Sequence, residues 1–123
     1  MAIPTNIKTL LSGDVVEWAR IEYKETWDAA ASLKTICAFA NDLDNWGGGY
    51  IVIGVKENNG RPTYPLKGVS TDKLDAYQKS IYAKCKLIRP SYTPIISVER
   101  YQDKQFIVIS VSYTHLRAHE TKA

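Results

Sequence analysis

Cysteine is scarce in this chain. Two occur among 123 residues, Cys37 and Cys85, and no CxxC pair or Cys/His cluster accompanies them. This scarcity argues against a zinc module or a disulfide-stabilised secreted scaffold. Both cysteines fall on apolar positions of helix-like patterns, so we expect buried thiols in a cytoplasmic protein. A disulfide or a metal site is the alternative.

Long hydrophobic runs are also missing. The longest is about half a dozen residues, around Tyr50–Val55, whereas a membrane-spanning helix needs about 20. The opening stretch MAIPTNIKTLLSGD has one lysine and no long apolar core, which excludes a secretory signal. We therefore expect one globular domain that does not span a membrane.

The last thirteen residues, Val111–Ala123, lack periodicity and hold both histidines of the chain. The string VSYTHLRAHET resembles the translation of a common transposase-based sequencing adapter, with Lys122 and Ala123 coming from the index behind it. We expect a domain over residues 1–110, truncated at its C-terminal end, and a non-native adapter-derived tail over 111–123. An unusual polar terminus is the alternative. His115 and His119 are accordingly left out of any site.

Excess charge of one sign is small. The net charge is +3, and it falls to +2 when the two basic residues and one acidic residue of the expected tail are removed. Global charge therefore does not identify a partner, and a nucleic-acid surface would have to be a local patch.

The hydrophobic pattern predicts an α+β fold. RIEYK (20–24) alternates as a half-buried strand does, and a helix is expected from Asp28 to Asn41. YIVIGV (50–55) reads as a central strand covered on both faces. A second helix begins after Ser70 or Thr71, and two strands flanking RYQDK (100–104) form a hairpin. We predict a single small domain, order β-α-β-α-β-β, whose mixed or antiparallel sheet carries packed helices.

The glycines before the central strand do not predict a phosphate-binding loop. Such loops run strand, glycines, helix, so that a helix N-terminus faces the anion. Here the order is helix, glycines, strand, and no Gly-Lys-Ser/Thr follows. The glycines more simply end the helix and let two backbones approach closely.

Charged residues gather around two strands. EWARIEYKE holds Glu17 and Glu22, and Lys56 and Glu57 follow the central strand. Carboxylates converging from two strand ends could hold Mg²⁺ or Mn²⁺ for phosphodiester hydrolysis. Glu17 has the opposite strand parity to Glu22, so it joins only from before the strand or from a bulge. The alternative is a solvated face of mixed charge.

These segments together resemble the Schlafen-type AlbA domain, which also occurs in bacterial proteins described as transcriptional regulators or RNA-binding-domain proteins. The resemblance covers about residues 13–110. Its pattern is E-x4-E-[FY]-K, a helix ending A-F-A-N, a Gly-Gly turn and a strand ending I-G-V. The matching residues are Glu17, Glu22, Tyr23, Lys24, Ala38, Phe39, Ala40, Asn41, Gly48, Gly49, Ile53, Gly54 and Val55.

The resemblance implies a nucleic-acid-binding domain. In animal Schlafen proteins similar domains form a metal-dependent endoribonuclease with three acidic residues. By position these fall on Glu17 and Glu22, with the third near Glu57, where the animal proteins have Asp. The loop NDLDNW is longer than that of the family. Two such lobes act together in the animal proteins, and this chain has one.

Our leading hypothesis is the nucleic-acid-binding domain of a bacterial cytoplasmic regulator, contacting DNA or RNA mainly through phosphates and needing no cofactor. In relatives, ATPase-like and winged-helix domains commonly follow. One alternative is a ribonuclease using Mg²⁺ or Mn²⁺ on Glu17, Glu22 and Glu57. Another is a protein-interaction module, including a homodimer. The candidate nucleic-acid contacts are Arg20, Lys24, Lys56 and Arg61, with Trp46 as a base-stacking residue.

Overall fold

The computed structural model describes residues 7–11, 20–41, 48–89, 92–112 and 120–121. Three helices and eight strands occur in that part of the chain. They are α1 (Ile7–Leu11), β1 (Arg20–Lys24), α2 (Ala29–Asn41), β2 (Gly48–Ile53), β3 (Glu57–Asn58), β4 (Arg61–Pro62), α3 (Thr71–Cys85), β5 (Ile88–Arg89), β6 (Ile95–Tyr101), β7 (Lys104–Ser112) and β8 (Glu120–Thr121).

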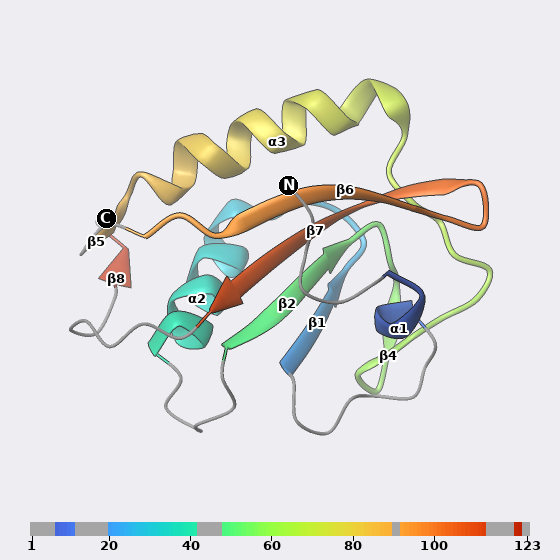
Figure 1. Ribbon diagram of the computed structural model, residues 1–123, viewed down its shortest axis with the longest axis horizontal. Helices are drawn as coiled ribbons and strands as arrows, with labels where there is room; N and C mark the ends of the chain where they lie inside the picture. The colour runs from blue at the N-terminus through green and yellow to red at the C-terminus, as the bar shows by residue number, and fades with distance from the viewer. Residues whose placement is uncertain (1–6, 12–19, 42–47, 90–91, 113–119, 122–123) are drawn as a thin grey trace.

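The main sheet has four strands in the order β1-β2-β7-β6. β1 runs parallel to β2, while β2 with β7 and β7 with β6 are antiparallel. The sheet is therefore mixed, and its strands with α2 and α3 follow the predicted order β-α-β-α-β-β (Figure 1). The prediction of a small α+β domain is confirmed. Two short pairs, β3-β4 and β5-β8, were not predicted.

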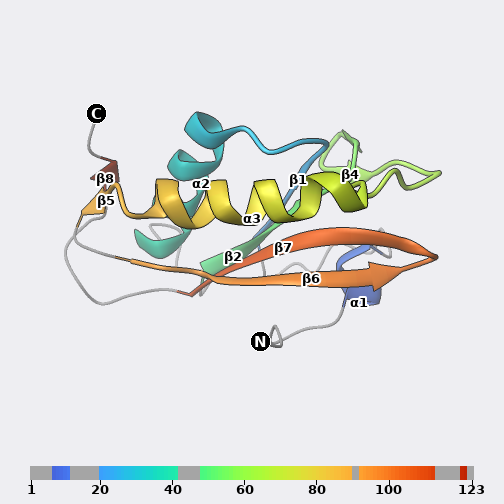
Figure 2. The same ribbon diagram turned by 90° about the horizontal axis from the view of Figure 1, so that it is seen from above.

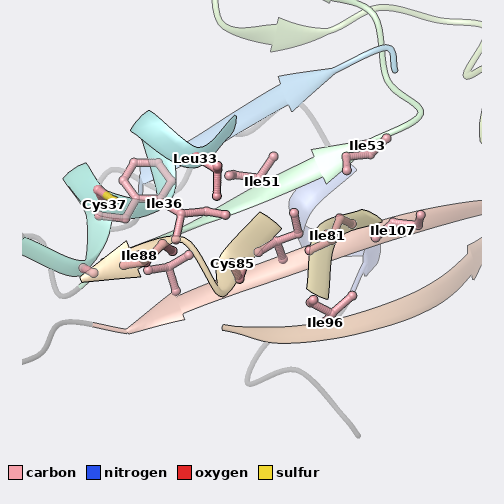
Figure 3. Packing of buried hydrophobic residues seen from close by; sticks show 14 of the residues in the cluster. Leu33, Ile36, Cys37, Ile51, Ile53, Ile81, Cys85, Ile88, Ile96 and Ile107 are labelled. Carbon is pink, nitrogen blue, oxygen red and sulfur yellow. The ribbon is translucent and has the colours of Figure 1, made fainter. Parts of the chain in front are cut away.

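Both long helices cover one face of the sheet, and α1 lies on the other (Figure 2). The predicted apolar stripe of α2 is buried at Leu33, Ile36, Cys37 and Ala40. It meets buried residues of α3 and of the sheet, including Ile81, Cys85, Ile51, Ile53 and Ile107 (Figure 3). Because these side chains come from segments far apart in the sequence, this cluster joins the two layers into one domain.

The two cysteines belong to this apolar layer. Both are buried and free, as their positions on the helix patterns predicted. Burial and the neighbouring Cys37 raise the pKa of the Cys85 thiol to about 11. The thiolate is the reactive form of cysteine, so Cys85 is held in its unreactive form at neutral pH.

The opposite face of the sheet is closed by α1 and by the chain around Leu66. Tyr23 and Val52 of the sheet pack there against Leu10 and Leu11. The Tyr23 hydroxyl donates a hydrogen bond of 2.5 Å to the carbonyl oxygen of Leu10. The central strand β2 is thus buried on both faces, as its continuous apolar run predicted.

Local signals in the sequence located several element ends. Asp28 accepts a hydrogen bond of 3.2 Å from the Ala31 backbone N–H, as a helix-capping residue does. Ser70 occupies the N-cap of α3, without a side-chain capping hydrogen bond. The β6-β7 turn consists only of Gln102 and Asp103, both with positive φ. The strands therefore extend into the predicted RYQDK connection.

Close backbone approach explains the glycine that begins β2. A Cβ atom on Gly48 would lie 2.0 Å from the Val111 carbonyl oxygen, and φ there is +111°. Only glycine fits that position of the β2-β7 pair. Gly48 thus confirms the structural interpretation of this segment.

The segment predicted to be a non-native tail contributes to two strands of the structure. Val111 is 2% exposed and Gly49 pairs with it, while Glu120–Thr121 forms β8 beside β5. The boundary at residue 110 concerns the origin of the gene sequence and stays a prediction. No helix of the described residues is long and apolar enough to cross a membrane.

Gly54 generates the first testable prediction. Its φ is +109°, and an added Cβ would lie 2.9 Å from the Gly68 backbone. We expect Gly54→Ala to lower the free energy of unfolding by roughly 2–4 kcal/mol, through strain and overpacking. Gly60→Ala is the control, because its φ is also positive while nothing lies within 4 Å of the added atom; it should cost about 1 kcal/mol. Equal urea-unfolding midpoints for the two variants would contradict this account.

Candidate nucleic-acid interface

Three pockets lie at one end of the sheet. This end gathers the last residues of β1 and β2, the β3-β4 hairpin, the loop before α3 and the β6-β7 turn (Figures 1 and 2, right). It is the carboxyl end of β1 and β2, since the two strands are parallel. Side chains leaving these strands and loops therefore meet on one surface.

The first pocket, which we call the carboxylate pocket, has a volume of about 240 Å³ and is lined by Ile21, Glu22, Tyr23, Lys24, Glu57 and Gly60. Glu22 Oε2 accepts a hydrogen bond of 2.6 Å from the Thr35 hydroxyl on α2. Glu57 Oε2 accepts one of 2.8 Å from the Gly60 N–H, within the β3-β4 turn. Each carboxylate is thereby oriented by its own surroundings, one by a helix and one by a tight turn.

Two of the three carboxylates predicted to converge, Glu22 and Glu57, line the same pocket. Glu17 lies outside the described residues. Among the described residues, no three His, Cys, Asp or Glu side chains come together to hold a metal ion. Carboxylate oxygens are suitable donors for Mg²⁺ or Mn²⁺, but a three-carboxylate site here would need Glu17.

The second pocket, the Tyr64 pocket, measures about 760 Å³ and is lined by Lys56, Glu57, Asn58, Thr63, Tyr64, Pro65, Leu66, Lys67 and Lys104. The Tyr64 hydroxyl donates a hydrogen bond to the Leu11 carbonyl oxygen of α1. The side chain is nevertheless 52% exposed. A ring held at its far end and open on its surface can act as a stacking platform for a base.

The third pocket, the α3 pocket, measures about 520 Å³ and surrounds the start of α3. Four of its lining residues are basic and two are acidic: Lys67, Lys73, Arg100, Lys104, Glu25 and Asp103. Lys67 forms an ion pair with Glu25, and this hydrogen bond is the main cause of the lowered pKa of the Glu25 carboxyl. Both side chains are exposed, so the pair itself adds little to stability.

The three pockets adjoin one another through shared lining residues. Glu57 lines both the carboxylate pocket and the Tyr64 pocket. Lys67 and Lys104 line both the Tyr64 pocket and the α3 pocket. We call the surface that the three pockets make up the terminal groove. Its basic residues are Lys24, Lys56, Lys67, Lys73, Arg100 and Lys104.

The structure brings together some of the predicted site residues. Glu22, Lys24, Lys56 and Glu57 all line the terminal groove. Arg61 is exposed in β4 and pairs with Asn58 across the hairpin. The remaining predicted site residues lie outside the described structure, namely Glu17, Trp46 and the side chain of Arg20.

Sequence reasoning missed five groove residues, namely Tyr64, Lys67, Lys73, Arg100 and Lys104. A usable signal existed for two of them, because Arg100 and Lys104 flank the predicted hairpin connection and so lie near one sheet end. Tyr64 and Lys67 lie in the loop between β4 and α3, and Lys73 lies in the first turn of α3, so their positions depend on how that loop folds back over the sheet. No local pattern in that loop predicts its path.

The fold and the terminal groove define a small α+β domain with a basic surface at one sheet end. The chain belongs to the Schlafen, AlbA_2 family, whose family model matches residues 17–122. This confirms the resemblance derived from the motif. A search of the curated proteins gives no match.

Two solved structures share this architecture. One is the solution structure of the N-terminal domain of a protein described as related to the ATP-dependent DNA helicase RecG, from Nitrosomonas europaea. It is 26% identical with a TM-score of 0.75, covering 97% of this chain and 82% of that one. The other is the DIP2311 protein from Corynebacterium diphtheriae, 16% identical with a TM-score of 0.58, covering 94% of this chain and 23% of that one. The second likeness concerns the fold alone, and the family and the first likeness fit a nucleic-acid-related domain.

Tyr23, in the wall of the carboxylate pocket, generates a prediction on pH. Burial, with a smaller effect from Tyr64, raises its pKa from 10.0 to about 12. Below pH 10 the hydroxyl is protonated in both states; between pH 10 and 12 only the unfolded state loses the proton, so stability falls as pH rises. We expect Tyr23→Phe to cost about 1 kcal/mol at neutral pH and to weaken this alkaline loss.

The measurement is urea unfolding at a series of pH values from about 7, where the hydroxyl is protonated in both states, to about 12, the raised pKa of the folded state. Tyr82→Phe is the matched control, because that side chain is 46% exposed on α3. An alkaline loss of stability that is the same in the Tyr23→Phe variant and the wild type would refute the role given to the buried hydroxyl.

Proposed function

We propose that this domain binds DNA or RNA along the terminal groove, mainly through backbone phosphates. The observation that carries the proposal is that the three pockets share the lining residues Glu57, Lys67 and Lys104 and that each pocket has basic residues. A phosphate backbone is a linear array of negative charges, so its natural partner is a linear array of cations. Phosphate contacts position a strand without reading its sequence.

Tyr64 favours unpaired bases over a closed duplex. Its exposed ring lies beside Lys56 and Lys104 in the same pocket. Proteins that bind single strands combine a positive groove with aromatic rings on which bases stack. The family and the likeness to the N-terminal domain of the RecG-related protein support a nucleic-acid role. In this proposal the domain is the nucleic-acid-binding part of a bacterial cytoplasmic regulator.

The salt dependence of binding tests the groove. Labelled single-stranded DNA and RNA should bind the full chain, with log affinity falling linearly with log salt. Lys56→Gln and Lys104→Gln should each weaken binding and reduce that slope by about 0.7 to 1, the share of one phosphate contact. Fluorescence anisotropy between about 50 and 200 mM salt measures both quantities.

Lys79→Gln is the matched control for this experiment. Lys79 is highly exposed on α3, 3.0 Å from Asp75, and lies away from the groove-lining residues. The Lys79→Gln substitution removes one positive charge, as the two groove substitutions do, and should leave the slope of log affinity against log salt unchanged. Equal losses in all three variants would show a diffuse charge effect, and absence of binding at low salt would refute the proposal itself.

A second candidate function is a metal-dependent ribonuclease, favoured by Glu22 and Glu57 lining one pocket with Lys24. These two carboxylates, with Glu17, would hold Mg²⁺ or Mn²⁺, which would activate a water and stabilise charge on the phosphate. Lys24, which lines the same pocket, would contact the same phosphate group. The pocket is open to the groove proposed above, so binding and cleavage would share one surface.

Incubation of structured RNA with Mn²⁺ tests this second function. If it holds, Glu22→Gln should lower the cleavage rate by more than about 100-fold, because loss of a direct metal ligand should exceed the roughly 10–100-fold cost of losing an outer-shell partner. Thr35→Val, which removes the hydrogen bond to Glu22, should have a smaller effect. Cleavage at the same rate by the wild type and by Glu22→Gln would exclude the carboxylate assignment. The cleavage would then come from another source, such as a contaminating nuclease.

A further inference from the structure

The walls of the α3 pocket are fixed by backbone hydrogen bonds. The Val69 N–H donates to the Gln105 carbonyl oxygen at 2.7 Å, and the Gly68 N–H donates to the Gly54 carbonyl oxygen at 2.8 Å. These bonds tie the loop before α3 to β7 and to the end of β2. The pocket is therefore formed before any ligand arrives, which lowers the entropic cost of binding.

The charges of this pocket favour a dianion. Lys67 is paired with Glu25. Lys73, Arg100 and Lys104 have no carboxylate at ion-pair distance among the described residues. Four basic and two acidic lining residues give the pocket a formal charge of +2. A phosphate monoester carries about −1.5 to −2 at neutral pH, whereas a phosphodiester carries one charge. The monoester is the better electrostatic match.

A buried polar atom points to a second ligand group. Gln105 lines the pocket, and its Oε1 is buried without a hydrogen-bond partner in the described structure. A buried amide oxygen left unpaired costs roughly 1–3 kcal/mol, so a ligand hydroxyl or amino group that reaches this atom on a small rotation of the Gln105 side chain would remove that cost. Tyr77 adds a half-buried aromatic wall. Phosphate, hydroxyl and ring are the parts of a nucleotide.

The size of the pocket is that of a small-molecule site. Its volume of about 520 Å³ lies within the range of roughly 300–1,000 Å³ found for such sites. This space is large enough for one nucleotide, and so it suits the end of a strand better than its middle. Because the α3 pocket adjoins the Tyr64 pocket through Lys67 and Lys104, a strand in the groove can place its last nucleotide there.

We infer that the α3 pocket binds the phosphate monoester of a nucleotide, supplied by the phosphorylated end of a strand lying in the terminal groove. This inference rests on the proposed function. A free mononucleotide carries the same group and is the other source that the experiment distinguishes. Arg100 and Lys73 hold the phosphate together with Lys104, and Gln105 accepts from the sugar hydroxyl or the base.

The test compares one oligonucleotide in three forms: 5′-phosphorylated, 3′-phosphorylated and without a terminal phosphate. Binding to the full chain is measured by fluorescence anisotropy, with a mid-strand label. We expect one phosphorylated form to bind about tenfold more tightly than the unphosphorylated form, the scale of one charge-assisted contact. Arg100→Gln should abolish this difference between the phosphorylated and unphosphorylated forms. Lys79→Gln should preserve the difference.

Each outcome decides between the two proposals. Salt-dependent binding that is equal for all three forms overturns the inference and leaves the proposed function standing. Binding of adenosine monophosphate by the wild type and not by Arg100→Gln, with no oligonucleotide bound, refutes the proposed function and assigns the pocket to free nucleotides. No binding of any of these probes refutes both. Lys73→Gln is the second pocket variant if Arg100→Gln does not fold.

Discussion

One close contact between backbone segments organises the end of the sheet that carries the terminal groove. At the end of β2, the N–H groups of Gly54 and Val55 both donate to the Lys24 carbonyl oxygen, at 2.8 and 3.1 Å. The Gly54 carbonyl oxygen in turn accepts from Gly68. The two glycine backbones are so close that a Cβ on Gly54 would clash with Gly68. This contact joins the ends of β1 and β2 to the loop that leads into α3, and the terminal groove is built on that junction.

The division between scaffold and site follows from this arrangement. Between the helices and the sheet, buried aliphatic side chains fill the space and leave no room for a ligand. At the sheet end, strands give way to turns whose side chains reach solvent, among them Lys56, Lys67 and Lys104. Hydrogen bonds tie the backbone beneath them together, so these basic side chains start from one end of the sheet. Basic side chains gathered on one surface are suited to contacts with phosphate groups.

The sequence predicted the parts of the fold that depend on local pattern. Alternation in RIEYK placed Tyr23 against the core and Glu22 on the opposite face, where it meets Thr35 of α2. The continuous apolar run predicted β2 as a central strand, and the order of elements excluded a phosphate-binding loop at its start. Period and order carry this information because each is set by neighbouring residues.

The candidate site was only partly predictable for the same reason. Lys24, Lys56 and Glu57 were predicted because they lie at or just beyond the ends of segments whose pattern predicted strands: Lys24 is the last residue of β1, and Lys56 and Glu57 follow the apolar run of β2. Lys67 and Tyr64 lie in a loop whose course depends on contacts with Glu25 and Leu11, far away in the sequence. Long-range contacts of this kind leave no periodic signal. Glu17 and Trp46 lie outside the described residues, and their proposed roles stay predictions.

The central claim is that a strand lies along the terminal groove with a base on Tyr64, and NMR spectroscopy tests it most directly. Titrating the labelled full chain with a single-stranded oligonucleotide should shift the amide signals of Lys56, Lys67 and Lys104. The ring protons of Tyr64 should move upfield, because a stacked base shields them. Shifts confined to the outer surface of α3 around Lys79, with the Tyr64 ring unchanged, would contradict the account.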